Sequence, residues 1–270
     1  MPRVDRRLVR SIVLASLGAV AAATAILAAL WMTTPDVRWL RAGGPRTTAL
    51  LEQRRAEARA AGRSFDAHLR FVPLDRISPR LIEAVILSED ASFFGHGPFD
   101  LRELRQAMGQ SLEARRWVRG ASTLTQQLAK NLFLGTERSL WRKTREAVLA
   151  VKLERTLGKR RILALYLNIA EWGDGVFGAD EAARARFGVP ASDLDTAQAA
   201  VLAAMLPAPR RADLAAPSPW LGRRSRRVLD LLLQQGLVTP EEHAHASAEL
   251  ERILAGPPAE DGDIEPPPEE

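Results

Sequence analysis

Two adjacent acids, Glu89 and Asp90, are residues whose type and setting suit chemistry. They end an otherwise apolar stretch, AVILSED, and aromatic residues and a histidine follow at Phe93, Phe94, His96 and Phe99. Acids at the carboxyl end of a helix oppose its dipole, and a carboxylate beside aromatic rings tends towards a raised pKa. That pKa suits a general acid or base, although the pattern also fits a plain helix-ending turn in which Asp90 bonds to the loop backbone.

A second group of candidate residues carries hydroxyl, amide and ammonium side chains in one short run. Its polar density is unsuited to simple packing: Ser122, Thr123, Thr125, Gln126, Gln127, Lys130 and Asn131. We expect Ser122 to cap a helix here, and Ser122, Gln126 and Lys130 to share one face of it because they are spaced one turn apart. Such a row suits a sugar or a phosphate, and an exposed polar helix is the alternative interpretation.

A third group lies in the cationic stretch RSLWRKTRE at residues 138–146. Arg138 and Arg142 are one helical turn apart, and Arg142 could simply pair with Glu146 one turn further on. The alternative is a cationic pocket for a phosphorylated group, which Lys143 would share and Glu146 would orient.

Composition narrows the chemistry that these groups can perform. The 270 residues include no cysteine, which excludes disulfides, thiolate zinc sites and cysteine nucleophiles. The four histidines are scattered and give no metal-binding pattern. The reaction must therefore run on carboxylates, hydroxyls, amides and cations. All four lysines fall within residues 130–159 in a chain with 34 arginines, which indicates that some of these positions need the compact ammonium group itself.

Residues 11–32 carry no charge over 22 positions, and as a helix they would just span a hydrocarbon core of about 30 Å. Arginines precede this stretch, so the positive-inside rule places the N-terminus in the cytosol and the remaining chain outside it. We expect an uncleaved anchor, with a cleaved signal peptide or a buried core helix as alternatives. Outside the cytosol, ATP, NAD and nucleic acid are excluded as partners. The net charge of +5 then indicates lipid headgroups, a phosphorylated lipid substrate or a solvated surface.

Helix start signals dominate the remaining chain and predict a mainly α fold. Ser78-Pro79, Asp100 with Glu103, and Ser139 each open a helix, and RRILALYLNIAEW predicts another over residues 160–172. Only residues 68–74 have an extended pattern, and the acidic, proline-rich end is expected to be disordered. The expected parts are a basic cytosolic N-terminus (1–10), the transmembrane anchor (11–32), a juxtamembrane segment (33–70), a helical domain (71–256) and the tail (257–270).

Four motifs occur in order within this helical domain. They read Glu89-Asp90-x-x-Phe93-x-x-His96-x-x-x-Asp100, Gly120-Ala121-Ser122-Thr123-x-x-Gln126-Gln127, Arg142-Lys143-x-x-Glu146 and Lys159-x-x-Ile162-Leu163-x-x-Tyr166-Leu167-Asn168. On these residues the chain resembles, over about 71–236, the peptidoglycan glycosyltransferase (transglycosylase) family, of which class A penicillin-binding proteins carry one version. The flanks VPLDRISP and NIAEWGDGVFG resemble its monofunctional biosynthetic branch from Gram-negative bacteria.

The resemblance implies a lysozyme-like helical fold and polymerisation of lipid II into β-1,4-linked glycan strands. The growing chain on undecaprenyl pyrophosphate would be the donor, and lipid II the acceptor. Glu89 would be the general base that takes the proton of the acceptor GlcNAc 4-hydroxyl, and Glu146 the second essential acid. The other motif residues are implied to bind substrate, with Lys130 and Arg138 at the pyrophosphate: Asp90, Phe93, His96, Asp100, Ser122, Thr123, Gln126, Gln127, Lys130, Arg138, Arg142 and Lys143.

The resemblance also implies where the protein works and with what. It implies a single-pass protein of the cell inner membrane with a periplasmic catalytic domain, and other cell-wall synthesis proteins as further candidate partners. No tightly bound cofactor and no protein metal site are expected, although a divalent cation, magnesium or manganese, could assist the pyrophosphate.

The chain departs from the family pattern in two places and lacks one feature of the larger relatives. Pro98, preceded by Gly97, stands where the first motif usually has glycine, which affects the loop that carries His96. Ala121 replaces a glycine common in penicillin-binding proteins. No Ser-x-x-Lys occurs, so a transpeptidase activity is not expected.

Two other functions remain as alternatives. A lysozyme-like or lytic enzyme could also use two acids in a helical cleft, but hydrolysis needs no pyrophosphate clamp, and the cations Lys130, Arg138, Arg142 and Lys143 are present. A non-catalytic lipid II-binding scaffold would be expected to lack Glu89 or Glu146, and both are present.

Overall fold

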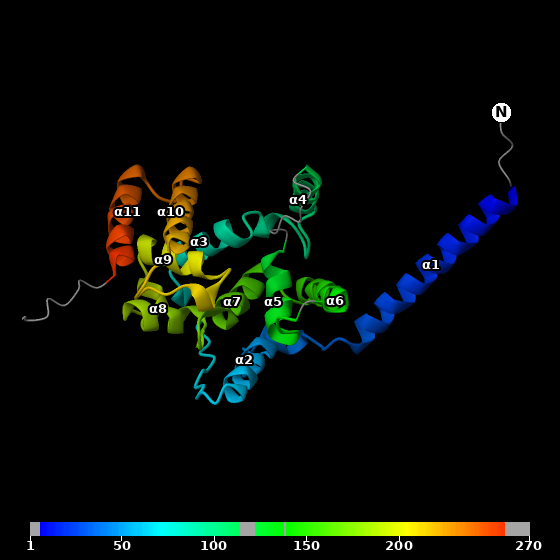
Figure 1. Cartoon of the computed structure of the whole chain (residues 1–270), viewed down its shortest axis with the longest axis horizontal. Helices are drawn as coiled ribbons and strands as arrows, with labels where there is room; N and C mark the ends of the chain where they lie inside the picture. The colour runs from blue at the N-terminus through cyan, green and yellow to red at the C-terminus, as the bar shows by residue number, and fades with distance from the viewer. Residues whose placement is uncertain (1–5, 114–121, 138, 257–270) are drawn as a thin grey trace, which may run out of the picture.

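Figure 1 shows the computed structural model of the chain, which describes residues 6–113, 122–137 and 139–256. One long helix, α1 (Arg6–Thr33), extends away from a body of shorter helices. Its apolar part, Arg10–Thr33, has a mean hydropathy of 2.3, and none of its most apolar window is buried against the body. The predicted apolar helix is therefore present and fits a single-pass membrane anchor. The predicted tail, 257–270, lies outside the described residues.

The body consists of two groups of helices around one main hydrophobic core, with a smaller apolar cluster of Leu50, Leu51, Ala67 and Phe177 beside α2 (Ala49–Ala60). This confirms the predicted mainly α fold. One of these helices, α9 (Thr196–Met205), is buried on nearly every side because it is made almost entirely of alanines and aliphatic residues. The first group is α3 (Pro79–Glu89), α9 (Thr196–Met205), α10 (Pro219–Gln234) and α11 (Pro240–Ala255). The second group is α2 (Ala49–Ala60), α5 (Leu124–Phe133), α6 (Leu140–Thr156) and α7 (Lys159–Ile169).

The smaller elements join and flank these two groups. The helix α4 lies at the edge of the body in Figure 1, and a two-stranded antiparallel hairpin follows α7. The remaining α-helices and strands are α4 (Leu101–Glu113), β1 (Glu171–Gly173), β2 (Val176–Phe177) and α8 (Ala179–Phe187). The 3₁₀ turns are η1 (Arg38–Arg41), η2 (Leu74–Arg76), η3 (Phe93–Gly95), η4 (Ala191–Asp193) and η5 (Pro209–Arg211).

The helix predicted over residues 160–172 ends earlier, at Ile169, and the hairpin begins two residues later. The buried Asn168 side chain explains the end, because its amide bonds both the N–H and the C=O of Val72, at 2.7 and 2.9 Å. Gly178, at φ +87°, then returns so close that a Cβ would lie 2.8 Å from the Asn168 carbonyl oxygen. Apolar periodicity does not reveal such tertiary contacts, so the predicted helix was too long. Residues 68–74, expected to be extended, form no strand with the described chain.

Most predicted helix starts are confirmed, and one is wrong. The Asp100 carboxylate accepts the N–H groups of Arg102 and Glu103 at the start of α4, and Ser139 accepts the N–H of Arg142 in α6. The cap of α5 is Thr123 and not Ser122. Because Gln126 lies three residues after Thr123, the two close a reciprocal capping box, an arrangement that Ser122 could make only with Thr125.

Candidate active site

Glu89 is the last residue of α3, and its side chain lies where the two helix groups meet. Only 10% of this side chain is exposed. Gln127 Nε2 of α5 donates to one carboxylate oxygen at 3.1 Å, and Arg224 Nη2 of α10 donates to the other at 2.9 Å. Burial raises the pKa of Glu89, and these two donors oppose the rise without cancelling it. The raised pKa expected from the sequence is present, but its cause is burial between helices.

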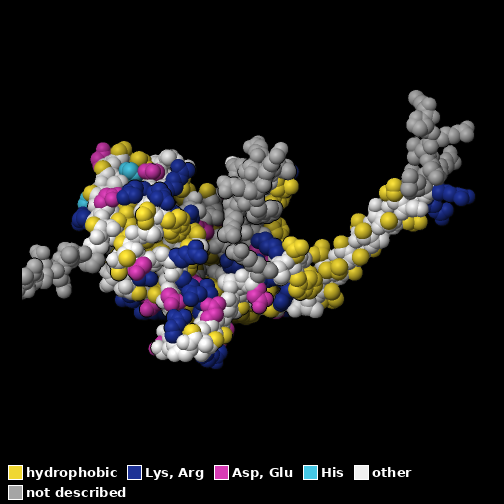
Figure 2. All heavy atoms as spheres, in the orientation of Figure 1, with side chains coloured by type: hydrophobic (Ala, Val, Ile, Leu, Met, Phe, Trp, Pro, Cys, Tyr) yellow, Lys and Arg dark blue, Asp and Glu magenta, His cyan; other side chains and the backbone are white. Residues whose placement is uncertain are grey.

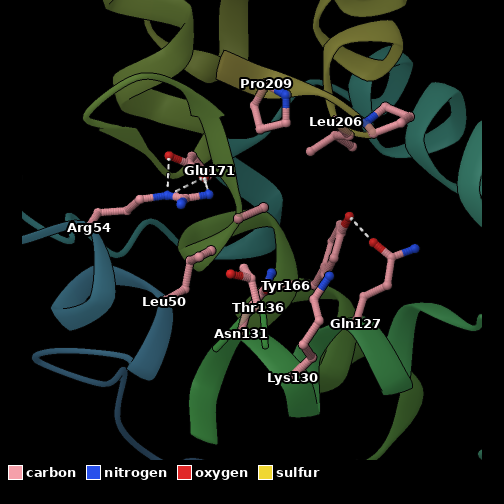
Figure 3. Close-up of a pocket in the computed structure, with 12 residues that line it drawn as sticks. Leu50, Arg54, Gln127, Lys130, Asn131, Thr136, Tyr166, Glu171, Leu206 and Pro209 are labelled. Atoms are coloured by element: carbon pink, nitrogen blue, oxygen red, sulfur yellow. Dashed lines mark hydrogen bonds and ion pairs between the residues drawn. The ribbon is translucent and has the colours of Figure 1, made fainter. Parts of the chain in front are cut away.

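Tyr166 fixes the direction in which the Gln127 amide points. Its hydroxyl donates to Gln127 Oε1 at 3.0 Å, as the dashed line in Figure 3 shows, which leaves the amide nitrogen to face Glu89. Burial, together with the charge of Glu89, raises the pKa of Tyr166 well above its usual value. Tyr166 therefore remains a hydrogen-bond donor at neutral pH. Tyr166 of α7, Gln127 of α5 and Glu89 of α3 form a chain of two hydrogen bonds.

Arg224 is a site residue that the sequence analysis missed. It contacts Glu89 from a position 135 residues further along the chain. Nothing in its local sequence distinguishes it from the other arginines, because RRSRR supplies several candidates around it. Only the fold of α10 against α3 selects Arg224, so no local signal could have identified it.

Asp90, although adjacent to Glu89, faces a different set of partners. It is 2% exposed, and one oxygen lies 2.6 Å from His96 Nε2. The other oxygen accepts the backbone N–H of Leu124, the first residue of α5, at 2.9 Å. A carboxylate at a helix N-terminus complements both the free N–H groups and the dipole. Asp90 thus fastens the end of α3 to the start of α5, which is close to the turn interpretation weighed from the sequence.

The expected row of Ser122, Gln126 and Lys130 is not formed as a single ligand-facing surface. Gln126 is 6% exposed, and its side-chain oxygen accepts the N–H of Thr123 within the capping box. The Gln126 amide therefore caps the start of α5 and does not face a ligand together with Ser122 and Lys130. Thr123 is also turned inward, because its hydroxyl donates to the carbonyl of Pro98 at 3.0 Å. Of this motif, Gln127 and Lys130 reach the space beside Glu89.

Glu146 organises the cations of the third motif. It is 3% exposed in the second turn of α6, and it accepts Arg142 Nη1 at 2.6 Å and the ammonium of Lys143. That ammonium also lies 3.3 Å from the hydroxyl of Ser122. The simple pair and the cationic cluster considered from the sequence are therefore both present. Two cations around one carboxylate leave an excess positive charge. Arg138, expected to add to it, lies outside the described residues.

Lys130 lies between the two acids and is the cation most available to a ligand. No residue in the described ranges forms a hydrogen bond or ion pair with its ammonium. Burial is the main cause that lowers the pKa of Lys130, opposed by the charges of Glu146 and Glu89 and reinforced by those of Arg142 and Lys143. A half-buried ammonium without a partner is costly, and an anionic ligand would remove that cost.

A cavity of about 190 Å³ opens beside Lys130. Figure 3 shows Lys130, Tyr166 and Gln127 on one side of it and the pair Arg54–Glu171 on the other. The guanidinium of Arg54 donates to both oxygens of Glu171, at 2.8 to 3.0 Å. The sequence analysis missed this pair as well, because its members lie 117 residues apart. The cavity is lined by cationic, amide, hydroxyl and carboxylate groups together with leucine and proline side chains, and this mixed lining suits a hydroxyl-rich ligand such as a sugar.

Three of the remaining predicted site residues support the loop between α3 and α4. Phe93 is fully buried, with the ammonium of Lys159 4.3 Å from its ring centre. Asp100 accepts the hydroxyl of Ser92 as well as the N–H groups of α4. His96 Nδ1 lies 2.7 Å from the carbonyl of Gly97, beside the Pro98 that departs from the family pattern. These residues hold the loop between α3 and α4 in place and do not line the cavity.

The site thus combines one buried carboxylate with a separate cluster of cations. A buried carboxylate of raised pKa can accept a proton from a hydroxyl group. Fixed cations nearby stabilise charge that develops on a phosphorylated leaving group. Among the described residues there is no group of three or more histidines and acids that could hold a metal ion.

The sequence is similar to that of proteins from one known family. The family model described as Transglycosylase matches residues 57–233. The chain is similar to proteins named biosynthetic peptidoglycan transglycosylase. That of Laribacter hongkongensis is 48% identical over 190 residues, which are 70% of this chain and 82% of that protein. Those of Nitrosospira multiformis and Bordetella pertussis are 41% and 44% identical, over 74% of this chain in each case and 86% and 84% of those proteins.

Because the two adjacent acids have different partners, we expect substitution of Asp90 to lower the stability of the fold and substitution of Glu89 not to lower it. Asp90→Ala leaves the N–H of Leu124 without its acceptor and should lower the free energy of unfolding by about 1–3 kcal/mol. Glu89→Gln removes a buried carboxylate whose raised pKa makes the charged form unfavourable in the fold, so it should not lower that free energy at neutral pH. Urea unfolding of both variants checks this. Equal loss of stability in the two would contradict the assignment.

Proposed function

The chain belongs to the transglycosylase family and is a peptidoglycan glycosyltransferase of cell-wall synthesis, and we propose that it joins lipid II units and releases undecaprenyl pyrophosphate. The acceptor would be lipid II, and the donor a growing chain on the lipid pyrophosphate. The observation that carries the proposal is the buried Glu89 carboxylate, held by Gln127 and Arg224, together with the ammonium of Lys130, which has no partner among the described residues.

In the proposed reaction Glu89 acts as the general base. A sugar hydroxyl is too weak an acid to attack unassisted, so a positioned carboxylate contributes about 10²–10⁴-fold. Glu89 Oε1 or Oε2 would take the proton of the acceptor 4-hydroxyl as its oxygen attacks C1 of the donor sugar. The C1–pyrophosphate bond breaks, and its electron pair leaves with the pyrophosphate. Attack opposite to an α-linked leaving group gives the β-1,4 linkage.

Lys130, Arg142 and Lys143 would bind the departing pyrophosphate, with Arg138 as a further candidate. Charge develops on the leaving oxygen in the transition state, and fixed cations stabilise it most when they are already oriented. Glu146 would act through Arg142 and Lys143, each of which bonds one of its oxygens. A pyrophosphate needs no proton to leave, so the site needs one base and several cations. This distinguishes it from a hydrolase, whose sugar leaving group requires a general acid.

A divalent cation, magnesium or manganese, would be held by the substrate in this scheme. The charged neighbours of Lys130 are the two acids Glu89 and Glu146 and the two cations Arg142 and Lys143, and the described residues include no group of three or more acids and histidines that could hold a metal ion. The pyrophosphate oxygens are the ligands that such an ion prefers. In this proposal no cofactor is tightly bound to the protein.

The anchor would keep the enzyme in the same membrane as its lipid-linked substrates. Helix α1 would span the inner membrane with its arginine-rich start in the cytosol and the body in the periplasm. Both the donor and the acceptor carry lipid tails, so an anchored enzyme meets them by diffusion within the membrane. Other cell-wall synthesis proteins are proposed as further partners at this location.

Polymerisation of labelled lipid II in detergent tests the proposed function. The wild-type enzyme should form long glycan strands, and Glu89→Gln should lower the rate about 10²–10⁴-fold because it removes the base. Glu83→Gln, which removes a carboxylate from the same helix α3, serves as the matched control and should keep the rate. If lipid II stays intact while preformed glycan is cleaved, the enzyme is a lytic enzyme and the proposal fails.

The pH dependence of the rate tests the role of Arg224. Because burial raises the pKa of Glu89 above 4.5, activity should fall as the pH drops through that raised value. Arg224→Ala removes a charge that lowers this pKa, so the acid limb of the profile should move to higher pH. Arg224→Lys should restore the limb, and Arg227→Ala, on the exposed side of α10, should leave it in place. A limb that stays or moves to lower pH in Arg224→Ala would contradict this role.

A further inference from the structure

The segment that follows α1 is built into the body and is not a free linker. Thr34, Val37 and Leu40 are 4%, 2% and 0% exposed, respectively. Val37 and Leu40 belong to the main hydrophobic core of the body. A flexible segment of ten residues would let its ends wander over roughly 17 Å. Because these side chains are buried, the segment directly after the apolar helix cannot move freely relative to the body.

Polar contacts fasten the same segment to the corner between α6 and α7. Arg41 Nε donates to the carbonyl of Thr156 at the end of α6, at 3.1 Å. Arg161, in the first turn of α7, donates to the carbonyls of Leu40 and Gly43, each at 2.7 Å. The carbonyl of Thr156 is one that a helix end leaves without an intrahelical partner. The anchor segment therefore completes the hydrogen bonding of the body.

The end of the anchor helix is held directly by two cations of α6. Lys152 Nζ donates to the carbonyl of Thr34 at 2.8 Å and lies 5.1 Å from the ring centre of Trp31. The guanidinium carbon of Arg155 lies 5.7 Å from the same centre. Cations are favourable both at the carboxyl end of a helix and over an indole ring. We call Trp31, Thr34, Lys152 and Arg155 the anchor clamp.

The clamp and the cations proposed to bind pyrophosphate lie on the same helix. Lys152 follows Lys143 by nine residues in α6, which corresponds to roughly 14 Å along a helix axis. A helix does not shorten or bend readily over this length. The distance between the clamp and the cations Lys143 and Arg142 is therefore fixed.

We propose that the anchor clamp rigidly couples the transmembrane helix to α6 and so holds the catalytic site at one height and orientation above the bilayer. The proposal rests on the proposed function, because a membrane-embedded pyrophosphate substrate gives that height its meaning. Lipid-borne substrate then meets the cation cluster in one pose. In detergent micelles, where the substrate is free to tumble, the coupling has no such role. Trp31 and Lys152 are thus positioning residues and touch no substrate.

Spin-label distances measure the coupling directly. The chain contains no cysteine, so Ala22→Cys in α1 and Ala56→Cys in α2, both exposed, would carry the only labels. The clamp variant combines Trp31→Ala with Lys152→Ala. The control combines Trp39→Ala with Arg160→Ala, which removes an exposed tryptophan and an exposed cation close by that make no clamp contact. In liposomes of phosphatidylethanolamine and phosphatidylglycerol, the distance distribution should broaden in the clamp variant alone.

Polymerisation rates show whether the coupling matters to the reaction. The clamp variant should lose about tenfold in rate on lipid II in those liposomes, because misorientation costs reactive encounters, and should match wild type in micelles. A distribution that stays narrow in the clamp variant, or a liposome rate equal to that of the control, would overturn the proposal. If the wild type makes no glycan even in micelles, the proposed function fails, and the distance distribution alone decides the coupling.

Discussion

The carboxylate of Glu89 lies buried at the end of α3, and the polar contacts of the proposed site are arranged around it. A buried carboxylate without partners would cost several kcal/mol, so groups must approach it from outside its own helix. Gln127 arrives from α5, and Arg224 from α10. Tyr166 of α7 in turn fixes the Gln127 amide. The pKa of Glu89 remains raised in spite of these partners, which keeps the group close to the proton affinity that a base needs.

Positive charge is gathered nearby on α5 and α6. Glu146 binds Arg142 and Lys143, while Lys130 has no partner among the described residues. Burial of a cation without a partner is unfavourable until an anion arrives, which supports the proposal that the site binds a phosphorylated ligand. Asp90 serves this arrangement by joining α3 to α5, the helix that carries both Gln127 and Lys130. The two adjacent acids therefore differ: Asp90 joins two helices, and Glu89 is the proposed base.

The sequence predicted the mainly α fold, the apolar anchor, the acid pair and the cations, because each leaves a local pattern. It could not predict Arg224 or the pair Arg54–Glu171, since these contacts join positions more than a hundred residues apart. Gln126 was misplaced for a different reason: a capping box competes for its amide, and residue spacing alone does not show which partner prevails. The hairpin after Ile169 was missed because Asn168 and Gly178 end the helix through tertiary contacts.

Titration of the Glu89 carboxyl group itself tests the central claim most directly. Infrared difference spectra between wild type and Glu89→Gln, recorded across a pH series, isolate the carbonyl band of the protonated Glu89 side chain. The account predicts that this band persists above pH 4.5, the ordinary value for glutamic acid, because burial outweighs the stabilisation from Gln127 and Arg224. A band that disappears at or below that value would contradict it, since Glu89 would then be an ordinary ion-paired carboxylate and too weak a base for the proposed reaction.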